Sequence, residues 1–564
     1  MIAGSIPPFA IFFAGALIAL LTRGWLRSAV LLLIPILGAL NLAGFHHGAF
    51  WQEPFLGHTL TLVRVDKLSL LFGYLFHIAA FIGLVYALHE RDAVQQLAAV
   101  LYAGGALGAV FAGDLIVLFV FWEVLTVSSV FLVWARRTDR ANAAGMRYLV
   151  VQVSSGLLLL LGILVRVHET GSIAFGFIGL GSLSTWLIFF AFGIKCAFPG
   201  LHSWLVDAYP EATPMGSVFL SAFTTKVAVY ALARAYPGAE PLVYIGVVMT
   251  MFPIFYAVIE NDLRRVLAYS MINQIGFMVC GIGIGTEMAI NGAVSHAFND
   301  VIFKGLLFMS MGAVLFRTGK INGSELGGLY KSMPFTAGLC IVGAASISAF
   351  PLFSGFVSKS MVMVAALEQG RPIVWLALLF ASAGVFHHAG IKIPYFAFFA
   401  HDSGVRTREA PWNMLLAMLL AAALCLFNGC YPWVLYGLLP FPVHYVPFDG
   451  SHVLAQTQLL FFSALAFTWL NLSGLYPPEL RSVNIDADWI YRRACPAIIR
   501  VTVDWLAATR RDGIAMAVRL FDRFMVVVFH YNGPQGVLAR TWPIGGAAIW
   551  VLALLAGLLI IYYV

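Results

Sequence analysis

GIKCAFPGLHSWLVDAYP (residues 193–210) is the stretch that decides the fold, and ISAFPLFSGFVSKS (residues 347–360) is its counterpart further along the chain. Each stretch places a proline, Pro199 or Pro351, inside an apolar run long enough to cross a bilayer. Proline removes a backbone donor and kinks or unwinds a membrane helix, and the freed carbonyl groups are tolerated only beside other protein or a wet cavity. Two interrupted membrane helices at matching places are typical of transporters.

The composition predicts a helical membrane protein. Hydrophobic residues make up 61% of the 564 positions and charged residues only 10%. Apolar runs of about 20 residues, the length of a membrane-spanning helix, repeat along the whole chain, without the alternation that marks a β-barrel. We therefore expect an all-α, polytopic membrane protein with about 14–16 transmembrane helices. The first run has neither a basic flank nor a small-residue cleavage site, so we expect it to be a retained span.

Windows of apolar residues place about sixteen spans along the chain. Their predicted boundaries are residues 8–23, 28–46, 65–88, 93–112, 114–135, 146–167, 184–207, 214–234, 241–259, 265–285, 288–316, 336–366, 373–398, 411–438, 455–477 and 544–563. They group into N-terminal transmembrane helices (1–92), a first five-helix half-channel (93–234), an inverted second five-helix half-channel (241–398), C-terminal transmembrane helices (411–477), an amphipathic segment (478–543) and a last transmembrane helix (544–564).

The two interrupted helices predict the internal repeat in this grouping. They are the seventh and twelfth spans, and because the offset between them is odd, the second copy is inverted relative to the first. Two half-channels that meet near the midplane of the membrane are the expected consequence.

Basic residues are concentrated in the odd-numbered loops between the spans. By the positive-inside rule these loops face the cytoplasm, so both chain termini are predicted on the outer side of a bacterial plasma membrane. The formal net charge of +7 is largely this basic collar and gives no indication of nucleic-acid binding. The basic residues of the odd loops include Arg23, Arg27, Arg136, Arg137, Arg140, Arg264, Arg265, Lys331, Arg406 and Arg408.

Residues 478–543 interrupt the hydrophobic rhythm. They hold nine arginines mixed with aliphatic and aromatic residues. This mixture predicts an amphipathic helix along the cytoplasmic face, interrupted at Pro496 and ended near Asn532. A solvated basic linker is the alternative, although aromatic residues this frequent are uncommon in linkers.

Five of the eight lysines and one glutamate lie inside predicted spans. A charge at bilayer depth costs at least about 2.5–3.5 kcal/mol and is normally kept for a reason, so these residues predict a proton or ion path. They are Glu123, Lys195, Lys226, Lys304, Lys359 and Lys392.

The first three of these residues have separate expectations. Glu123 has no basic residue within a turn, so we expect a partner on another helix and predict Lys195; a protonated, hydrogen-bonded glutamate is the alternative. Lys195 lies four residues before Pro199, where loosened carbonyl groups are expected to hold its ammonium group. Lys226 lies deep in its span and is predicted to relay protons between the half-channels, and snorkelling to an interface is its alternative.

His296, Asp300 and Lys304 are spaced four residues apart, so they line one face of a helix over about 12 Å. Histidine titrates near neutrality, and an imidazole, a carboxylate and an amine in one stripe predict a proton wire. Asp300 and Lys304 neutralising each other is the alternative. Lys359 and Lys392 extend the row, with the weaker case for Lys392 near the cytoplasmic end.

The sequence contains no motif for a metal or cofactor. The six cysteines are scattered without a C-x-x-C pair, which argues against iron–sulfur and zinc sites. His387 and His388 have no nearby carboxylate or cysteine that would complete a metal site. We therefore expect no cofactor and no metal.

Several motifs, in order and correctly spaced, resemble the antiporter-like subunits shared by respiratory complex I and Mrp-type cation/proton antiporters. The likeness runs from about residue 110 to 366, and residues 391–404 and 440–448 resemble subunit-D-like proteins of the Mrp group. The motifs are GIKCAFPGLHSWLVDAYPEATP (193–214), FTTKVAVYALAR (223–234), NDLRRVLAYSMINQIGFM (261–278), SHAFNDVIFKGLLFMSMGAVL (295–315) and FPLFSGFVSK (350–359).

The resemblance implies two inverted five-helix half-channels and a hydrophilic axis along which protons move. It implies that Glu123 is the fifth-helix glutamate of this axis, Lys195 and Lys226 the lysines of the first half, His296 and Lys304 the second-half pair, and Lys359 the twelfth-helix lysine. Two features depart from the family. Asp300 stands where many relatives have a second histidine, and the chain beyond about residue 450 is similar in layout to the lateral arm of the distal complex I subunit.

These observations predict a proton-translocating subunit of a multisubunit Na⁺/H⁺ antiporter with other integral membrane proteins as partners. Three alternatives stay open: the proton-translocating arm of a redox complex, a proton-fed partner of an anion or bicarbonate uptake system, and an intramembrane enzyme. The absence of H-E-x-x-H, of aspartate-rich pairs and of a G-x-S-x-G elbow argues against the enzyme. Any redox chemistry would reside in a partner, because no nucleotide, flavin or cluster motif is present.

Overall fold

The computed structural model describes residues 4, 6–480 and 484–564. The chain forms two units, Met1–Ala487 and Asp488–Val564. In the described residues, thirteen helices are long and apolar enough to cross a membrane, and three shorter apolar helices accompany them. The predicted all-α, polytopic fold class is confirmed. Residues 1–3, 5 and 481–483, which belong to the predicted regions 1–92 and 478–543, lie outside the described residues.

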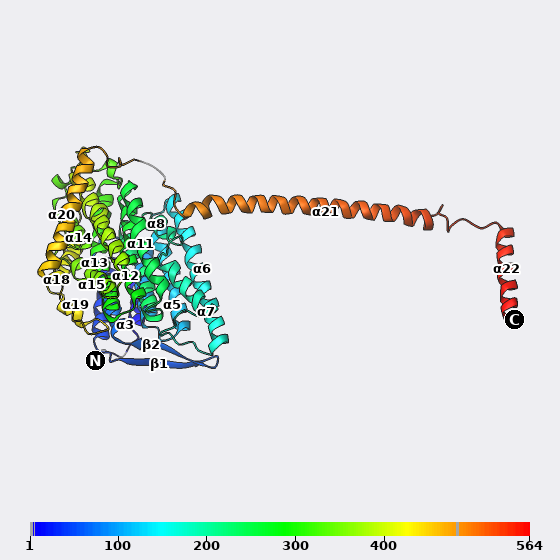
Figure 1. Ribbon diagram of the computed structural model, residues 1–564, viewed down its shortest axis with the longest axis horizontal. Coiled ribbons are helices and arrows are strands. Elements are labelled where there is room, and N and C mark those ends of the chain that lie inside the picture. The colour runs from blue at the N-terminus through cyan, green and yellow to red at the C-terminus, as the bar shows by residue number, and fades with distance from the viewer. Residues whose placement is uncertain (1–3, 5, 481–483) are drawn as a thin grey trace. The chain divides into compact units, whose positions relative to one another are not determined.

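The chain starts with two helices, a β-hairpin and a third helix. These elements are α1 (Pro8–Leu21), α2 (Gly24–Leu42), β1 (Gly48–Phe55), β2 (His58–Val65) and α3 (Lys67–Tyr86). The antiparallel hairpin lies across one end of the first unit (Figure 1). Thr61 of β2 accepts from the backbone N–H of Gly113 at 3.0 Å and donates its own N–H to Asp114 at 2.7 Å.

The hairpin was not predicted from the sequence, which left residues 47–64 as a loop. Its second strand, HTLTLVRV, alternates polar and apolar residues and carried the signal for a strand.

The next seven helices form the first half of the bundle. They are α4 (Ala93–Phe111), α5 (Leu115–Trp134), α6 (Asp139–Thr170), α7 (Leu183–Lys195), α8 (Ser203–Ala208), α9 (Pro214–Ala222) and α10 (Thr224–Ala235). The break predicted around Pro199 is confirmed, because α7 ends at Lys195 and Ala197 has a left-handed φ of 62°. A second break, at Phe223 between α9 and α10, was not predicted.

A second group of helices follows. It comprises α11 (Glu240–Ile259), α12 (Leu263–Ile284), α13 (Glu287–Thr318), the 3-10 turns η1 (Gly323–Glu325) and η2 (Leu329–Lys331), α14 (Pro334–Ile347), α15 (Ser354–Glu368) and α16 (Pro372–Val385), which continues through η3 (Phe386–Ile391), α17 (Lys392–Pro394) and η4 (Tyr395–Phe399). The predicted break at Pro351 is confirmed, because it separates α14 from α15. The span predicted at 373–398 contains π-helical turns on both sides of Lys392.

The two groups repeat the same end structures. Asp114 caps α5 and Asp262 caps α12, and each aspartate forms a β-bridge with the segment that follows the next long helix. The caps of α6 and α13 match as well, with a threonine at the start and a left-handed glycine at the end. The same sequence interval separates the members of each pair: Asp114 and Asp262, Thr138 and Thr286, Gly171 and Gly319, Ala174 and Asn322.

Hydrogen bonds place the starts of α5 and α12 on opposite faces. The start of α5 binds the hairpin through Asp114. The other end of α5 carries Arg136, which donates to the carbonyl group of Pro210 at 2.9 Å. Arg264, at the start of α12, donates to the carbonyl group of Ala212 at 2.9 Å in the same connection. The end of α5 and the start of α12 therefore share one face, and the hairpin lies at the other (Figure 1).

Close packing of α11 on α12 depends on glycine. A Cβ atom on Gly246 would lie 2.4 Å from the backbone nitrogen of Cys280, and one on Gly276 would lie 2.7 Å from the backbone nitrogen of Thr250. Small residues of this kind allow membrane helices to approach closely.

The remaining elements of the first unit are α18 (Trp412–Cys430), α19 (Trp433–Gly437) and α20 (Gly450–Leu472). The second unit contains η5 (Ile490–Ala494), the 38-residue α21 (Cys495–Asn532) and α22 (Ile544–Tyr563). The predicted end near Asn532 is confirmed. The predicted interruption at Pro496 is wrong, because the π-helical turn η5 leads directly into α21 and this proline is the second residue of α21.

Candidate functional site

The ionisable residues singled out in the sequence are buried in the first unit. Each of the five lysines is at most 1% exposed, and His296 and Asp300 are fully buried. Glu123 is partly buried.

Lys195 is the last residue of α7 and binds α5. Its Nζ donates to the carbonyl oxygen of Trp122 at 2.7 Å and to the Thr126 hydroxyl oxygen at 2.9 Å, and it lies 4.7 Å from the centre of the Trp122 ring. The expectation that loosened carbonyl groups near Pro199 hold this ammonium group is wrong, because its acceptors come from α5.

Glu123 does not form the predicted direct ion pair with Lys195. Among the described residues its Oε1 is buried without a hydrogen-bond partner. The carboxyl group points at α6, where a Cβ atom on Gly156 would lie 1.5 Å from Oε1. One residue along a helix turns by about 100°, so Glu123 faces a different neighbour from Trp122. The two charges remain close enough to interact electrostatically.

Lys226 and Asp300 form a fully buried ion pair with 2.6 Å between Nζ and Oδ2. The pair joins α10 of the first helix group to α13 of the second. Lys226 also donates to the carbonyl oxygen of Ser221 at 3.1 Å. Snorkelling of Lys226 is excluded by its burial. Asp300 contacts Lys226 rather than Lys304, so the alternative in which Asp300 and Lys304 neutralise each other is wrong as a direct pair.

His296 and Lys304 extend the polar stripe along α13. His296 Nε2 lies 3.1 Å from Gln274 Oε1, and His296 Nδ1 lies 3.1 Å from the hydroxyl oxygen of Ser358. Lys304 donates to the hydroxyl oxygen of Ser270 at 2.8 Å. The histidine therefore bridges α12 and α15.

Lys359 follows Ser358 on α15, next to the second helix break. Its Nζ donates to the carbonyl oxygen of Ile347, the last residue of α14, at 3.0 Å. The Phe277 ring centre lies 5.1 Å away. A carbonyl group at the interrupted helix thus holds an ammonium group here.

Lys392 has three close oxygen acceptors. Its Nζ lies 2.6 Å and 2.7 Å from the carbonyl oxygens of Val258 and Glu260, at the end of α11, and 2.8 Å from Glu479 Oε1. Three acceptors fill the donor capacity of an ammonium group. Glu479 was not predicted, because it follows the last apolar residues of the α20 region and no pattern links it to Lys392.

The uncharged partners of the row were also missed by sequence reasoning. Ser270 and Gln274 stand one turn apart on α12, and Ser358 precedes Lys359. Polar residues one turn apart inside an apolar span were the available signal. The described part of the chain holds no cluster of three or more His, Cys, Asp or Glu residues suited to a metal ion.

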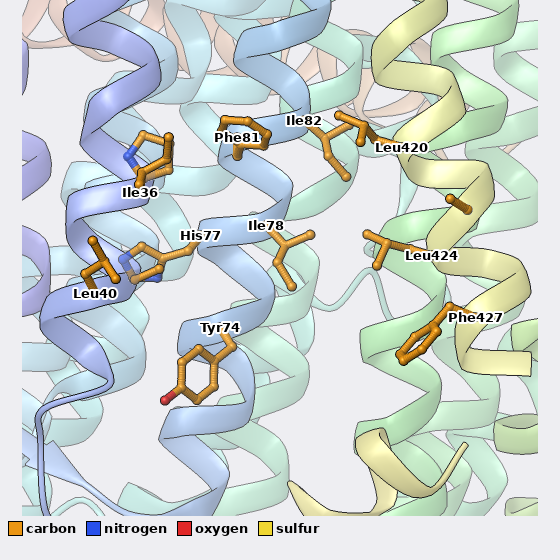
Figure 2. Close-up of a pocket in the computed structure, with 13 residues that line it drawn as sticks. Ile36, Leu40, Tyr74, His77, Ile78, Phe81, Ile82, Leu420, Leu424 and Phe427 are labelled. Atoms are coloured by element: carbon orange, nitrogen blue, oxygen red, sulfur yellow. The ribbon is translucent and has the colours of Figure 1, made fainter. Parts of the chain in front are cut away.

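A separate apolar pocket of about 710 Å³ lies between α2, α3 and α18, as Figure 2 shows. Phe81, Leu424 and Phe427 are among its lining residues. Its lining includes the imidazole ring of His77, whose Nδ1 lies 2.7 Å from the carbonyl oxygen of Gly73. The pocket is lined mainly by apolar side chains and shares no lining residue with the lysine row.

Comparison with known proteins identifies the family. Residues 112–386 match the membrane family described as NADH:quinone oxidoreductase/Mrp antiporter. NADH-quinone oxidoreductase subunit N of Desulforudis audaxviator is 30% identical over 420 residues, which are 67% of this chain and 82% of that protein. The chain belongs to this NADH:quinone oxidoreductase/Mrp antiporter family. The resemblance inferred from the motifs is confirmed.

Two further relatives are longer proteins, and only part of each one matches this chain. Hydrogenase-4 component B of Escherichia coli is 30% identical over 68% of this chain and 64% of its own length. A Na⁺/H⁺ antiporter protein of Alkalihalophilus pseudofirmus is 30% identical over 68% of this chain and 54% of its own length. The chain therefore spans about half to two thirds of these two proteins.

Two solved structures share the fold at 22% sequence identity. A chain of the Mrp complex from Dietzia sp. DQ12-45-1b matches with a TM-score of 0.66 over 77% of this chain and 92% of that chain. A chain of the membrane-bound sulfane sulfur reductase, an archaeal respiratory membrane complex, matches with a TM-score of 0.71 over 98% and 99%.

Proposed function

We propose that this protein is the proton-translocating membrane subunit of a multisubunit monovalent cation (Na⁺)/H⁺ antiporter. Protons move along a buried row of ionisable side chains through intervening water. The row consists of Glu123, Lys195, Lys226, Asp300, Lys304, His296 and Lys359. The Lys392 ammonium group already has three oxygen acceptors. We therefore assign this lysine to anchoring the end of α11 and not to the row.

The observation that carries this proposal is the buried Lys226–Asp300 ion pair. Among the described residues, it is a direct contact between charged groups of the two helix groups. A proton arriving on either side changes the charge that the pair experiences, and in a low-dielectric interior such changes act over several ångströms. The protonation states of Lys195 and of the α13 stripe are thereby coupled.

The matching end structures support two inverted half-channels. Asp114 and Asp262 start equivalent helices from opposite faces, as expected if one group is inverted relative to the other. In this proposal each half-channel opens to one side of the membrane and the Lys226–Asp300 pair lies where they meet.

The proposed location is the bacterial plasma membrane, with the arginine-rich connections in the cytoplasm and both termini outside. The proposed partners are other integral membrane subunits, because the matching solved chains come from multisubunit membrane complexes. H⁺ and a monovalent cation are the proposed substrates.

Lys195→Ala tests the row. In the native complex, purified through a tag on this chain and reconstituted in liposomes, we expect the variant to assemble normally and to lose proton flux driven by an imposed cation gradient. Lys320→Ala, on an exposed connection, is the matched control and keeps wild-type flux. Normal flux with Lys195→Ala in a fully assembled complex would remove the row from the mechanism.

A second candidate is a proton-pumping membrane-arm subunit of a complex I-like or hydrogenase-like redox complex. The similarity to hydrogenase-4 component B favours it. The two candidates share the row and differ in their partners. Mass spectrometry of the native complex separates them: small hydrophobic subunits alone indicate the antiporter, flavin or iron–sulfur subunits indicate the redox pump, and an anion carrier indicates a proton-fed uptake system.

A further inference from the structure

The segment after α20 contributes a carboxylate to the first helix group. Asp486 Oδ1 and Oδ2 lie 3.1 Å and 3.2 Å from His202 Nε2, and Oδ2 accepts from the Tyr269 hydroxyl group at 2.7 Å. The neighbouring carbonyl oxygen of Ile485 accepts from Tyr256 at 3.0 Å. The segment is thereby fixed to the connection between α7 and α8, to α11 and to α12.

His202 stands in the break that follows Lys195, directly before α8. It is 3% exposed, and the Asp486 side chain is 8% exposed. Among the described residues, His202 Nδ1 is buried without a hydrogen-bond partner, and so is the hydroxyl oxygen of the adjacent Ser203. Buried polar atoms are normally satisfied by protein or water. One ring nitrogen is therefore held by a carboxylate, while the other has no hydrogen-bond partner among the described residues.

Among the described residues, the charged groups around this dyad are few. Tyr269 belongs to α12. On the same helix, Arg265 forms an ion pair with Glu260, with 3.1 Å between Nε and Oε2. From α11, the Phe252 ring packs 4.7 Å from the imidazole. Burial raises the pKa of the Asp486 carboxyl group, but hydrogen bonds from His202, Tyr269 and its own following N–H outweigh burial and hold the pKa below its ordinary value. Asp486 is therefore held as a carboxylate beside the His202 imidazole.

We propose that His202 and Asp486 form the site where the first half-channel exchanges protons with water on the face that carries the α11–α12 connection. This inference rests on the proposed function. A proton taken up at His202 Nδ1 makes the ring a cation that Asp486 neutralises, and the proton on Nε2 leaves through the carboxylate; the reverse sequence runs in the other direction. Asp486 lies outside residues 112–386, so the C-terminal part of the chain completes a site of the family core.

A purely structural role is the competing explanation, in which Asp486 only fastens the segment. The chain offers a matched control for it. Glu479, in the same segment, binds the Lys392 ammonium group, which has no free donor left for exchange. Loss of Glu479 removes a fastening point without removing a relay.

The test uses the native complex in liposomes and measures the initial proton flux from about pH 5 to 8, the range in which imidazole titrates. We expect Asp486→Asn and His202→Gln to lower the flux by about 100-fold, the low end of what a positioned proton-transfer group contributes, and to flatten its pH profile. Asp486→Glu restores the profile. Glu479→Gln keeps the wild-type profile, even where the amount of assembled complex falls.

The inference is overturned if Asp486→Asn assembles and keeps the wild-type pH profile, or if Asp486→Asn and Glu479→Gln reduce flux only in proportion to lost assembly. Lys195→Ala in the same preparation separates this failure from a failure of the proposed function. Flux that depends on Lys195 but not on Asp486 removes the exchange site alone. Flux that depends on neither removes both.

Discussion

The two helix groups share a framework and distribute their charges differently. At the interval that relates Asp114 to Asp262, the positions of Trp122 and Thr126 on α5 correspond to Ser270 and Gln274 on α12. The first pair binds Lys195. The second pair binds Lys304 and His296. In both helix groups, the same face of the equivalent helix therefore contacts buried ionisable side chains.

The long helices show the larger difference. His296, Asp300 and Lys304 on α13 correspond to Tyr148, Gln152 and Gly156 on α6. The α6 positions carry no charge, and Gly156 leaves the space that the Glu123 carboxyl group occupies. The first half therefore places its acid on α5, and the second half places its acid on α13. The Lys226–Asp300 pair joins the two arrangements.

The largest expected effect breaks this junction. Lys226→Met leaves Asp300 as an unpaired buried charge, which typically costs about 3–5 kcal/mol. We expect little assembled complex in the membrane, as measured by quantitative blotting and by the thermal stability of the purified remainder. Lys320→Met, on an exposed connection, controls for loss of a lysine. Normal stability of the Lys226→Met complex would show that the pair is not charged.

A smaller effect tests whether the α13 stripe, and not its α6 counterpart, moves protons. His296→Gln keeps hydrogen-bonding capacity toward Gln274 and Ser358 but removes a titratable proton, so we expect flux to fall by about 100-fold with normal assembly. Tyr148→Phe removes the hydroxyl contact with Ser129, 2.7 Å long, and a lost hydrogen bond of this kind costs about 1 kcal/mol of stability. Proton flux of both variants in liposomes is the measurement. Equal effects would contradict the assignment of different roles.

Gly156→Ala sharpens the role of Glu123. A Cβ atom 1.5 Å from Oε1 forces the carboxyl group out of its place, so the expected result is flux reduced by about tenfold, equivalent to 1.4 kcal/mol, with assembly retained. Gly305→Ala on α13, where a Cβ atom meets nothing within 4 Å, is the matched control. Wild-type flux from the Gly156→Ala complex would mean that the position of Glu123 is unimportant.

The smallest expected effect concerns the first-half lysine. Thr126→Val removes one of the two oxygen acceptors of Lys195 and keeps the side-chain volume. A lost hydrogen bond to a charged group costs about 1.5–3 kcal/mol, of which we expect only part to appear as lower flux. Thr126→Ser restores the acceptor and the flux. A Thr126→Val complex more active than wild type would contradict this contact.

The sequence predicted much of the framework because proline and buried charge are strong local signals. Pro199 and Pro351 located two of the helix breaks, and the apolar runs located the spans. The hairpin was missed because its alternation is confined to short strands outside the membrane. The break at Phe223 contains no proline, so no residue in the sequence indicated it.

The site was predicted less completely, because contacts depend on how helices are rotated. Glu123 was expected to meet Lys195, but neighbouring residues on a helix point in different directions, and Trp122 faces that lysine instead. Asp300 was placed on the correct stripe, while its partner came from another helix. Glu479 and Asp486 reach their partners through tertiary folding of a segment whose composition indicates only a connection.

The most direct test of the central claim replaces both members of the junction, with Lys226→Met and Asp300→Leu in one chain. Replacing a buried ion pair by apolar residues of similar volume is often neutral or stabilising, so the complex should assemble. Proton flux is then measured in liposomes under an imposed cation gradient. The account predicts an assembled complex without proton flux. Wild-type flux from that complex would contradict the claim that protons pass between the halves through Lys226 and Asp300.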